Sequence, residues 1–410
     1  MKAGGFHASQ LTGLRAVAVL LVYLFAHPPV GWVPCVPLSH ILKSPPFWQL
    51  LPHFESGVVL FFMLSGFLMG RLYLHKEFTS VNVAAYARAR VARVLPLYYV
   101  VLTIRICVTN PPMPSDVHGD RQPGALLTAL MLINANDFGA LWTVPVECQF
   151  YVLFLVFWYA TSRMRSGCQD RGVGWGRASC VVVHLVTLVT LAACVTLSTA
   201  ACVWCFWPQF ENALQAFYLP FTIHTFLIGM VLGASWPAVA KACTRHTTLL
   251  RFLGPLLLAY NVLPCDYWRV AAWEGWPVPK FVDAPAWPSR EWYFAWVDPL
   301  KLSSLAGLLI CAAHSTSSLS VLDSPFVQFL GNKSYGFYVW FQFVNGAVGE
   351  AAKWLTLPLP GCVASSLISL PAAFGVTCAV SFASFVLIER PVGAWIKRVG
   401  TVGAARGELL

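Results

Sequence analysis

Long apolar runs, each close to the length that crosses a lipid bilayer, follow one another along this chain with polar segments between them. The run from Val181 to Trp204, for example, contains no Asp, Glu, Lys or Arg. A transmembrane helix needs about 20 mostly apolar residues. The pattern predicts ten such helices, at residues 11–28, 57–74, 94–109, 141–160, 178–203, 217–235, 248–263, 299–314, 326–348 and 363–388. The apolar stretch 125–135 is too short to span, and we expect it to be interfacial or re-entrant.

The composition excludes soluble and disordered proteins. Of 410 residues, 58% are hydrophobic and only 11% are charged, whereas soluble domains carry about 25% charged residues. Aromatic residues make up 14% of the chain, and disordered segments contain few of them. A β-barrel would show alternating segments of about ten residues, but the apolar runs here are continuous. The sequence therefore predicts an all-α, polytopic transmembrane helical bundle.

The distribution of Lys and Arg predicts the orientation of this bundle, because cytoplasmic loops carry an excess of both. With a cytoplasmic N-terminus, the predicted cytoplasmic segments hold 17 of these residues and the opposite side holds 6. We therefore expect both termini to be cytoplasmic, with one integral membrane domain over 1–398 and a short tail over 399–410. The net charge of +10 then reflects topology, and no nucleic-acid partner is expected. A bacterial inner membrane or a eukaryotic internal membrane would both fit.

Ionisable residues in or beside a span are costly and indicate function by default, and three of those in the predicted spans are candidates for chemistry. Arg15 opens the first span, and His27 lies near its far end, directly before two prolines. Glu147 lies at the start of the span at 141–160. Structural alternatives exist for each: an interfacial anchor for Arg15, a helix-packing role for His27 and an ion pair for Glu147.

A basic segment, YARARVARVLP (Tyr86–Pro96), precedes the third predicted span. Arg90 and Arg93 are three residues apart and share one helical face, whereas Arg88 points elsewhere. A strip of arginines at the membrane surface suits anionic phosphates. The alternative is a cytoplasmic anchor that contacts anionic lipids.

No metal site is expected from the sequence. Most of the 13 cysteines lie within the predicted spans, where small apolar packing accounts for them. The histidines within or beside spans fit helix-to-helix hydrogen bonds.

Six segments, in order and spread over nearly the whole chain, resemble the motifs of the acyltransferase-3 family of integral membrane O-acyltransferases. They are LTGLRAVAVLLVYLFAH (Leu11–His27), GVVLFFMLSGFLMGRL (Gly57–Leu72), ARVARVLPLYYV (Ala89–Val100), LWTVPVECQFYVLF (Leu141–Phe154), LGNKSYGFYVWF (Leu330–Phe341) and LIERPVGAWIKR (Leu387–Arg398). The family patterns that they match read LDGLRGIAALLVVLFH, GVDLFFVLSGFLI, RRLLRILPLYW, LWSLSVEEQFYLL, LGRISYSLYLWH and IERPFRR.

The resemblance implies transfer of an acyl group, often acetyl, from cytoplasmic acyl-CoA to a hydroxyl of a glycan, a lipid or a small molecule. It implies catalytic roles for Arg15, His27 and Glu147. It implies that Arg88, Arg90 and Arg93 bind the CoA donor, and that Ser65, Tyr335 and Trp340 belong to the substrate pocket. Membrane lipids surround such a protein and are its other expected partners.

The chain departs from the family at several motif positions. The family places its first-span histidine eleven residues after the arginine, but Ala26 stands there and His27 follows. Twelve residues at 100° each leave His27 about 120° away from Arg15 on a straight helix, although Pro28 can alter the path. Family polar residues are replaced by Val59, Pro145, Cys148 and Phe341.

These departures leave two alternatives to an enzyme. One is a degenerate family member that binds lipid or glycan without turnover. The other is a transporter or flippase, against which the absence of paired repeats with broken helices counts.

Overall fold

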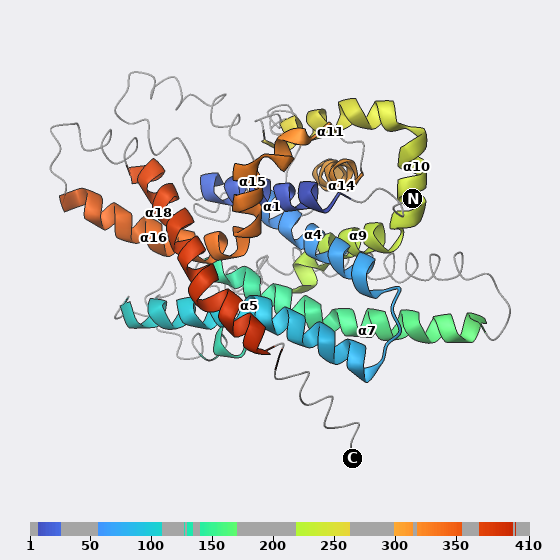
Figure 1. Cartoon of the computed structure of the whole chain (residues 1–410), viewed down its shortest axis with the longest axis horizontal. Helices are drawn as coiled ribbons and strands as arrows, with labels where there is room; N and C mark the ends of the chain where they lie inside the picture. The colour runs from blue at the N-terminus through green and yellow to red at the C-terminus, as the bar shows by residue number, and fades with distance from the viewer. Residues whose placement is uncertain are drawn as a thin grey trace, which may run out of the picture.

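The chain is all-helical in the part that the structure, a computed structural model, describes: residues 7–25, 56–108, 127, 129–133, 140–169, 219–262, 299–314, 318–354, 369–396 and 398. Figure 1 shows α1 and α4 in the middle of the molecule, with α5 and α7 along one side and α10 and α11 along the other. The elements are α1 (Ala8–Phe25), α4 (Ser56–Tyr73), α5 (Ser80–Val108), α7 (Thr143–Gln169), α9 (Leu219–Ala234), α10 (Trp236–Arg245), α11 (Thr247–Val262), α14 (Pro299–Ala313), η3 (Ser320–Asp323), α15 (Pro325–Asn332), α16 (Ser334–Trp354), α18 (Ser369–Ser384) and the π-helical η5 (Phe385–Glu389).

Nine of the ten predicted spans overlap a described helix, and the tenth, 178–203, lies outside the described residues. Among the described helices, four are long and apolar enough to cross a membrane. They are Ser56–Tyr73, Ser80–Val108, Ala140–Ser166 and Pro371–Ile396. A fifth span forms if Thr222–Ala234 and Trp236–Arg245, which meet at a bend of 71°, are taken together. The helical membrane character is thus confirmed, while ten spans and cytoplasmic termini stay predictions.

Helix α5 is longer than the sequence pattern predicts. The span predicted at 94–109 is only the second half of this helix, which begins at Ser80 and runs for 29 residues to Val108, with Pro96 inside it. The helical face expected for Arg90 and Arg93 in the basic segment is part of the same element. Alanine and arginine are both strong helix formers, so this segment continues the helix of the apolar run. The arginines are therefore held on the same rigid element as the membrane-embedded residues.

Helices α4 and α9 pack with their backbones in contact through four glycines. Gly66 and Gly70 of α4 face α9, and Gly229 and Gly233 of α9 face α4. A Cβ atom added at any of the four positions would collide with a carbonyl oxygen of the opposite helix. Glycines four residues apart share a helix face, and small residues allow transmembrane helices to approach closely.

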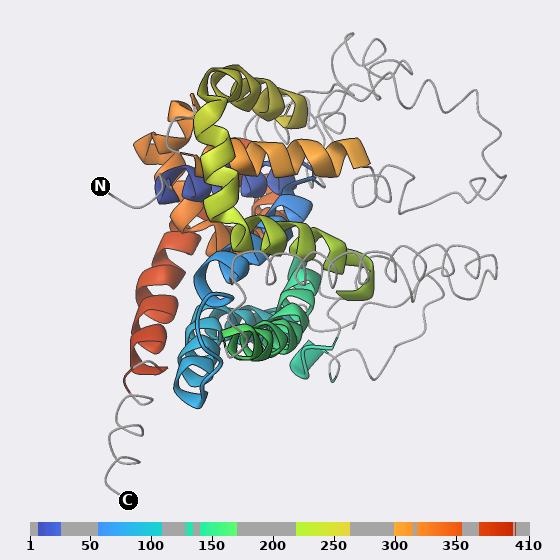
Figure 2. The same cartoon turned by 90° about the vertical axis from the view of Figure 1, so that its right-hand side faces the viewer.

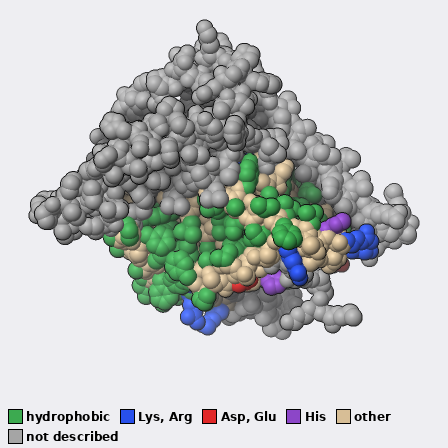
Figure 3. Space-filling model, turned by 90° about the horizontal axis from the view of Figure 1, so that it is seen from above, with side chains coloured by type: hydrophobic (Ala, Val, Ile, Leu, Met, Phe, Trp, Pro, Cys, Tyr) green, Lys and Arg blue, Asp and Glu red, His purple; other side chains and the backbone are tan. Residues whose placement is uncertain are grey.

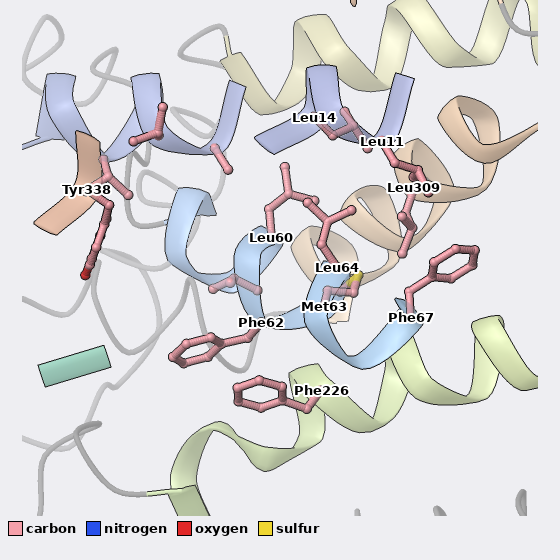
Figure 4. Close-up of a cluster of buried hydrophobic side chains, with 14 of the residues drawn as sticks. Leu11, Leu14, Leu60, Phe62, Met63, Leu64, Phe67, Phe226, Leu309 and Tyr338 are labelled. Atoms are coloured by element: carbon pink, nitrogen blue, oxygen red, sulfur yellow. The ribbon is translucent and has the colours of Figure 1, made fainter. Parts of the chain in front are cut away.

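Stacked aromatic rings join α7 to this pair. The ring of Phe226, on α9, lies between Phe62 of α4 and Phe150 of α7, at centroid distances of 4.4 Å and 4.1 Å. On the other side of α4, Leu60 and Leu14 bring α1 into the same core (Figure 4). Helix α4 is thus surrounded by α1, α7 and α9, and its position is fixed from three sides.

The described outer surface is strongly apolar. Figure 2 shows the helices after a turn of 90° from the view of Figure 1. Figure 3 shows hydrophobic side chains over the described part of one face, with Lys and Arg toward its margins. On α11, Leu249, Phe252 and Leu256 are 60%, 70% and 65% exposed. Exposed apolar patches of this kind mark an interaction surface, and in this bundle lipid is the expected neighbour.

Candidate active site

Helices α1, α4, α5, α7 and α16 surround one cavity with an empty volume of ≈ 740 Å³, including the part that opens outward. Six of the residues singled out from the sequence line it. They are Arg15, Ser65, Arg90, Arg93, Glu147 and Tyr335. These residues come from five separate helices, so the fold brings together positions that the sequence keeps up to 320 residues apart.

Glu147 lies at the centre of a hydrogen-bonded group. Ser65 Oγ donates a hydrogen bond of 2.7 Å to Glu147 Oε1, from α4 to α7. The phenol of Tyr151 donates to the same oxygen. Tyr151 is four residues after Glu147 on α7, which places both side chains on one face. Hydrogen bonds to an ionised group are stronger than those between neutral groups, so the two hydroxyls hold the carboxylate in one orientation.

Arg90 is held by aromatic rings rather than by a carboxylate. Its guanidinium carbon lies 5.9 Å, 5.9 Å and 5.6 Å from the ring centroids of Tyr73, Tyr86 and Tyr151. These are cation–π distances. Among the described residues, Arg90 Nε has no hydrogen-bond partner. Tyr151 therefore contacts both the carboxylate and this cation.

The other cations differ in their position. Arg93 is exposed and lies at the edge of the cavity. Its three-residue spacing from Arg90 places both side chains on the same face of α5. Arg15 enters the lining from α1 and lies within electrostatic range of Glu147, Arg90 and Arg93. Arg88 does not line the cavity, so a role for it in donor binding stays a prediction. The cavity thus combines three arginines with one oriented carboxylate.

Residues 9–388 match the model of the acyltransferase-3 family, which is described as an acyltransferase domain. The chain belongs to this family. The match covers nearly the whole chain and includes every helix that lines the cavity. No curated protein and no solved structure matches the chain. The resemblance carried by the six motifs is therefore confirmed, and membership supports a membrane acyltransferase.

Two further residues predicted for the substrate pocket of this acyltransferase-3 protein, Tyr335 and Trp340, lie in different places. Tyr335 lines the cavity, and its hydroxyl donates a hydrogen bond of 2.6 Å to the carbonyl oxygen of Val94. Trp340 is buried but does not line the cavity, and its ring packs against Phe343 at a centroid distance of 6.0 Å. Five residues turn an α-helix by about 140° beyond a full turn, which accounts for the different faces.

Sequence reasoning did not single out Tyr151 and Tyr338, which also line the cavity. Each lies within a motif and shares a helix face with a residue that was singled out, three or four positions away. Their spacing of four residues from Glu147 and three residues from Tyr335 was a signal in the sequence that could have identified them. His27, the predicted base, lies outside the described residues.

No group of three or more His, Cys, Asp or Glu side chains that could hold a metal ion occurs within the described ranges. The polar side chains that line the described part of the cavity include arginine, carboxylate and hydroxyl groups.

Proposed function

We propose that this protein transfers an acyl group, foremost acetyl, from cytoplasmic acyl-CoA to a hydroxyl of a glycan, a lipid or a small molecule. The observation that carries the proposal is the cavity that holds three arginines beside a carboxylate oriented by two hydroxyls. Arginine suits phosphate recognition, and an oriented carboxylate suits proton transfer.

The arginines supply the donor-binding end. Arg93 at the cavity edge and Arg90 further in bind the phosphates of the donor, and the tyrosine rings around Arg90 fix the direction of its guanidinium. Because α5 carries both side chains on one face, they act on the same ligand.

The reaction needs a base. The acceptor oxygen bonds to the thioester carbonyl carbon, the carbon–sulfur bond breaks, and the hydroxyl proton moves by way of the base to the departing sulfur. Neutral imidazole suits this role near neutral pH, and we propose His27 as the base, oriented by Glu147. Arg15 stabilises the negative charge that develops on the carbonyl oxygen.

The proposal is tested with radiolabelled acetyl-CoA given to membranes that contain the wild type, the His27→Ala variant or no copy of the protein. Label is then traced into lipid and glycan fractions. We expect label to move only with the wild type, into the fraction that holds the acceptor. Equal transfer by His27→Ala would require another base. No transfer by the wild type, together with no binding of acyl-CoA, would support a non-catalytic member of the family.

A further inference from the structure

The cavity is charged at one end and aromatic at the other. Helix α4 contributes one face along most of its length, and Ser65 lies near the middle of that face. Toward the end of α4, Tyr73 contacts Arg90. Toward its beginning, α4 contributes Val58, Phe61 and Phe62 to the lining. A ligand whose phosphates bind the arginines therefore extends past Ser65 toward the apolar end.

Two aromatic side chains form the wall at this apolar end. Phe61 of α4 and Tyr338 of α16 both line the cavity, and their rings meet edge to face at a centroid distance of 6.1 Å and an angle of 67°. This arrangement is the favoured geometry for aromatic pairs. Tyr338 is only 6% exposed, whereas Phe61 is half-buried.

The wall is supported by contacts with other helices. Phe62, the neighbour of Phe61, also lines the cavity; its ring stacks on Phe226 of α9 at a centroid distance of 4.4 Å and meets Trp142 at 6.3 Å. Figure 4 shows Phe62 directed toward Phe226, with Tyr338 entering from a different helix. Because close glycine contacts hold α4 against α9, Phe61 cannot move away from the cavity unless the whole helix moves.

The wall stands one helical turn from the chemical centre. Phe61 precedes Ser65 by four residues, and Thr143, also in the lining, precedes Glu147 by four. Four residues rise about 6 Å along a helix. An extended acyl chain grows by less than one carbon–carbon bond, about 1.5 Å, per carbon. A methyl group fits within this turn, whereas a chain of eight carbons would have to pass the two rings.

We propose that the Phe61–Tyr338 pair restricts the donor to short-chain acyl-CoA thioesters. The inference rests on the proposed function, since it needs the donor phosphates at the arginines and the acyl group beyond Ser65. It adds to that function a specificity determinant that comes from contacts between α4 and α16. A competing role for the same rings is a platform that holds the acceptor.

The test compares acetyl-, butyryl- and octanoyl-CoA as donors for the wild type and for Phe61→Ala, in membranes with the full chain. We expect the ratio of octanoyl to acetyl transfer, as kcat/KM, to rise about tenfold or more in the variant, the size of effect that a methylene-scale change in an apolar pocket gives. Phe61→Leu, a milder change, should shift the ratio in the same direction by less. Phe343→Ala, which removes a half-buried ring of α16 outside the cavity, should leave the ratio unchanged.

An unchanged ratio in an active Phe61→Ala variant would overturn the inference. A raised KM for the acceptor with the same donor ratio would overturn it too, in favour of the acceptor platform. If the wild type transfers no acyl group from any donor in the panel, the proposed function itself fails. Acyl transfer by the wild type therefore distinguishes failure of the proposed function from failure of the inference about chain length.

Discussion

Ser65 and Glu147 are joined by a hydrogen bond of 2.7 Å between Ser65 Oγ and Glu147 Oε1, although 82 residues separate them in the sequence. The bond links α4 to α7 inside the cavity. Tyr151 donates to the same carboxylate oxygen and also lies under the Arg90 guanidinium. The Glu147 carboxylate and the Arg90 guanidinium are thus connected through one phenol.

The first prediction concerns this phenol. Tyr151→Phe keeps the ring beneath Arg90 but removes the hydroxyl that donates to Glu147. A hydrogen bond to a charged group contributes about 1.5–3 kcal/mol, and we expect kcat to fall by on the order of tenfold or more with little change in the KM for acyl-CoA. Steady-state kinetics on membranes measure both constants. Tyr159→Phe, an exposed position on the same helix, is the control, and equal rates for the two variants would contradict the role of Tyr151.

The second prediction concerns the tyrosine rings around Arg90. Arg90→Lys keeps the positive charge but loses the planar group that stacks on three rings. We expect the KM for acyl-CoA to rise by about tenfold, in line with a partly buried cation–π contribution of about 1–2 kcal/mol. The matched control is Arg88→Lys, on the same helix but outside the cavity, for which a smaller rise is expected. Equal effects would place donor binding elsewhere on α5.

The third prediction concerns the glycine contacts between α4 and α9. Gly66→Ala would set a methyl group against the carbonyl oxygen of Phe226, and overpacking a close contact costs about 1–3 kcal/mol. We expect a lower thermal unfolding temperature in detergent. Gly346→Ala adds the same methyl group on α16, where nothing lies within 4 Å, and should not lower it. Unfolding at the same temperature in both variants would mean that α4 and α9 do not depend on this contact.

The fourth prediction concerns orientation. Asn332-Lys333-Ser334 is a glycosylation triplet that the charge distribution places on the cytoplasmic side. Expressed in a eukaryotic cell, the protein should therefore carry no glycan on Asn332, and reporters fused to both ends should remain cytoplasmic. Mass measurement before and after glycosidase treatment tests this directly. A glycan on Asn332 would reverse the orientation proposed for α15 and α16.

Hydropathy located helices because each predicted span is continuous and apolar, and nine of the ten overlap described helices. It did not give their bounds: the span predicted at 326–348, for example, is divided between α15 and α16. The motifs found Arg15, Ser65 and Glu147, which the structure brings into one cavity. Neither kind of reasoning gives the rotation of one helix against another. For that reason the motifs suggested Trp340 as a pocket residue although it does not line the described cavity, and the contact between Phe61 and Tyr338 became visible only in the fold.

The extent of α5 was also beyond the sequence pattern. Hydropathy marked only the apolar run at 94–109, whereas the helix begins at Ser80. Helix propensity favours the extension, and packing anchors it, because the phenol of Tyr86 donates a hydrogen bond to the carbonyl oxygen of Tyr151 on α7.

The most direct test of the account compares the wild type with Glu147→Gln, using radiolabelled acetyl-CoA and the acceptor fraction that the wild type labels. The amide keeps the size of the side chain and can still accept a hydrogen bond from Ser65, but it loses the negative charge that orients and assists the base. We expect transfer to fall by about 100-fold or more, the usual contribution of acid–base groups, while acyl-CoA binding persists. Transfer at the wild-type rate by Glu147→Gln would contradict the assignment of this cavity as the active site.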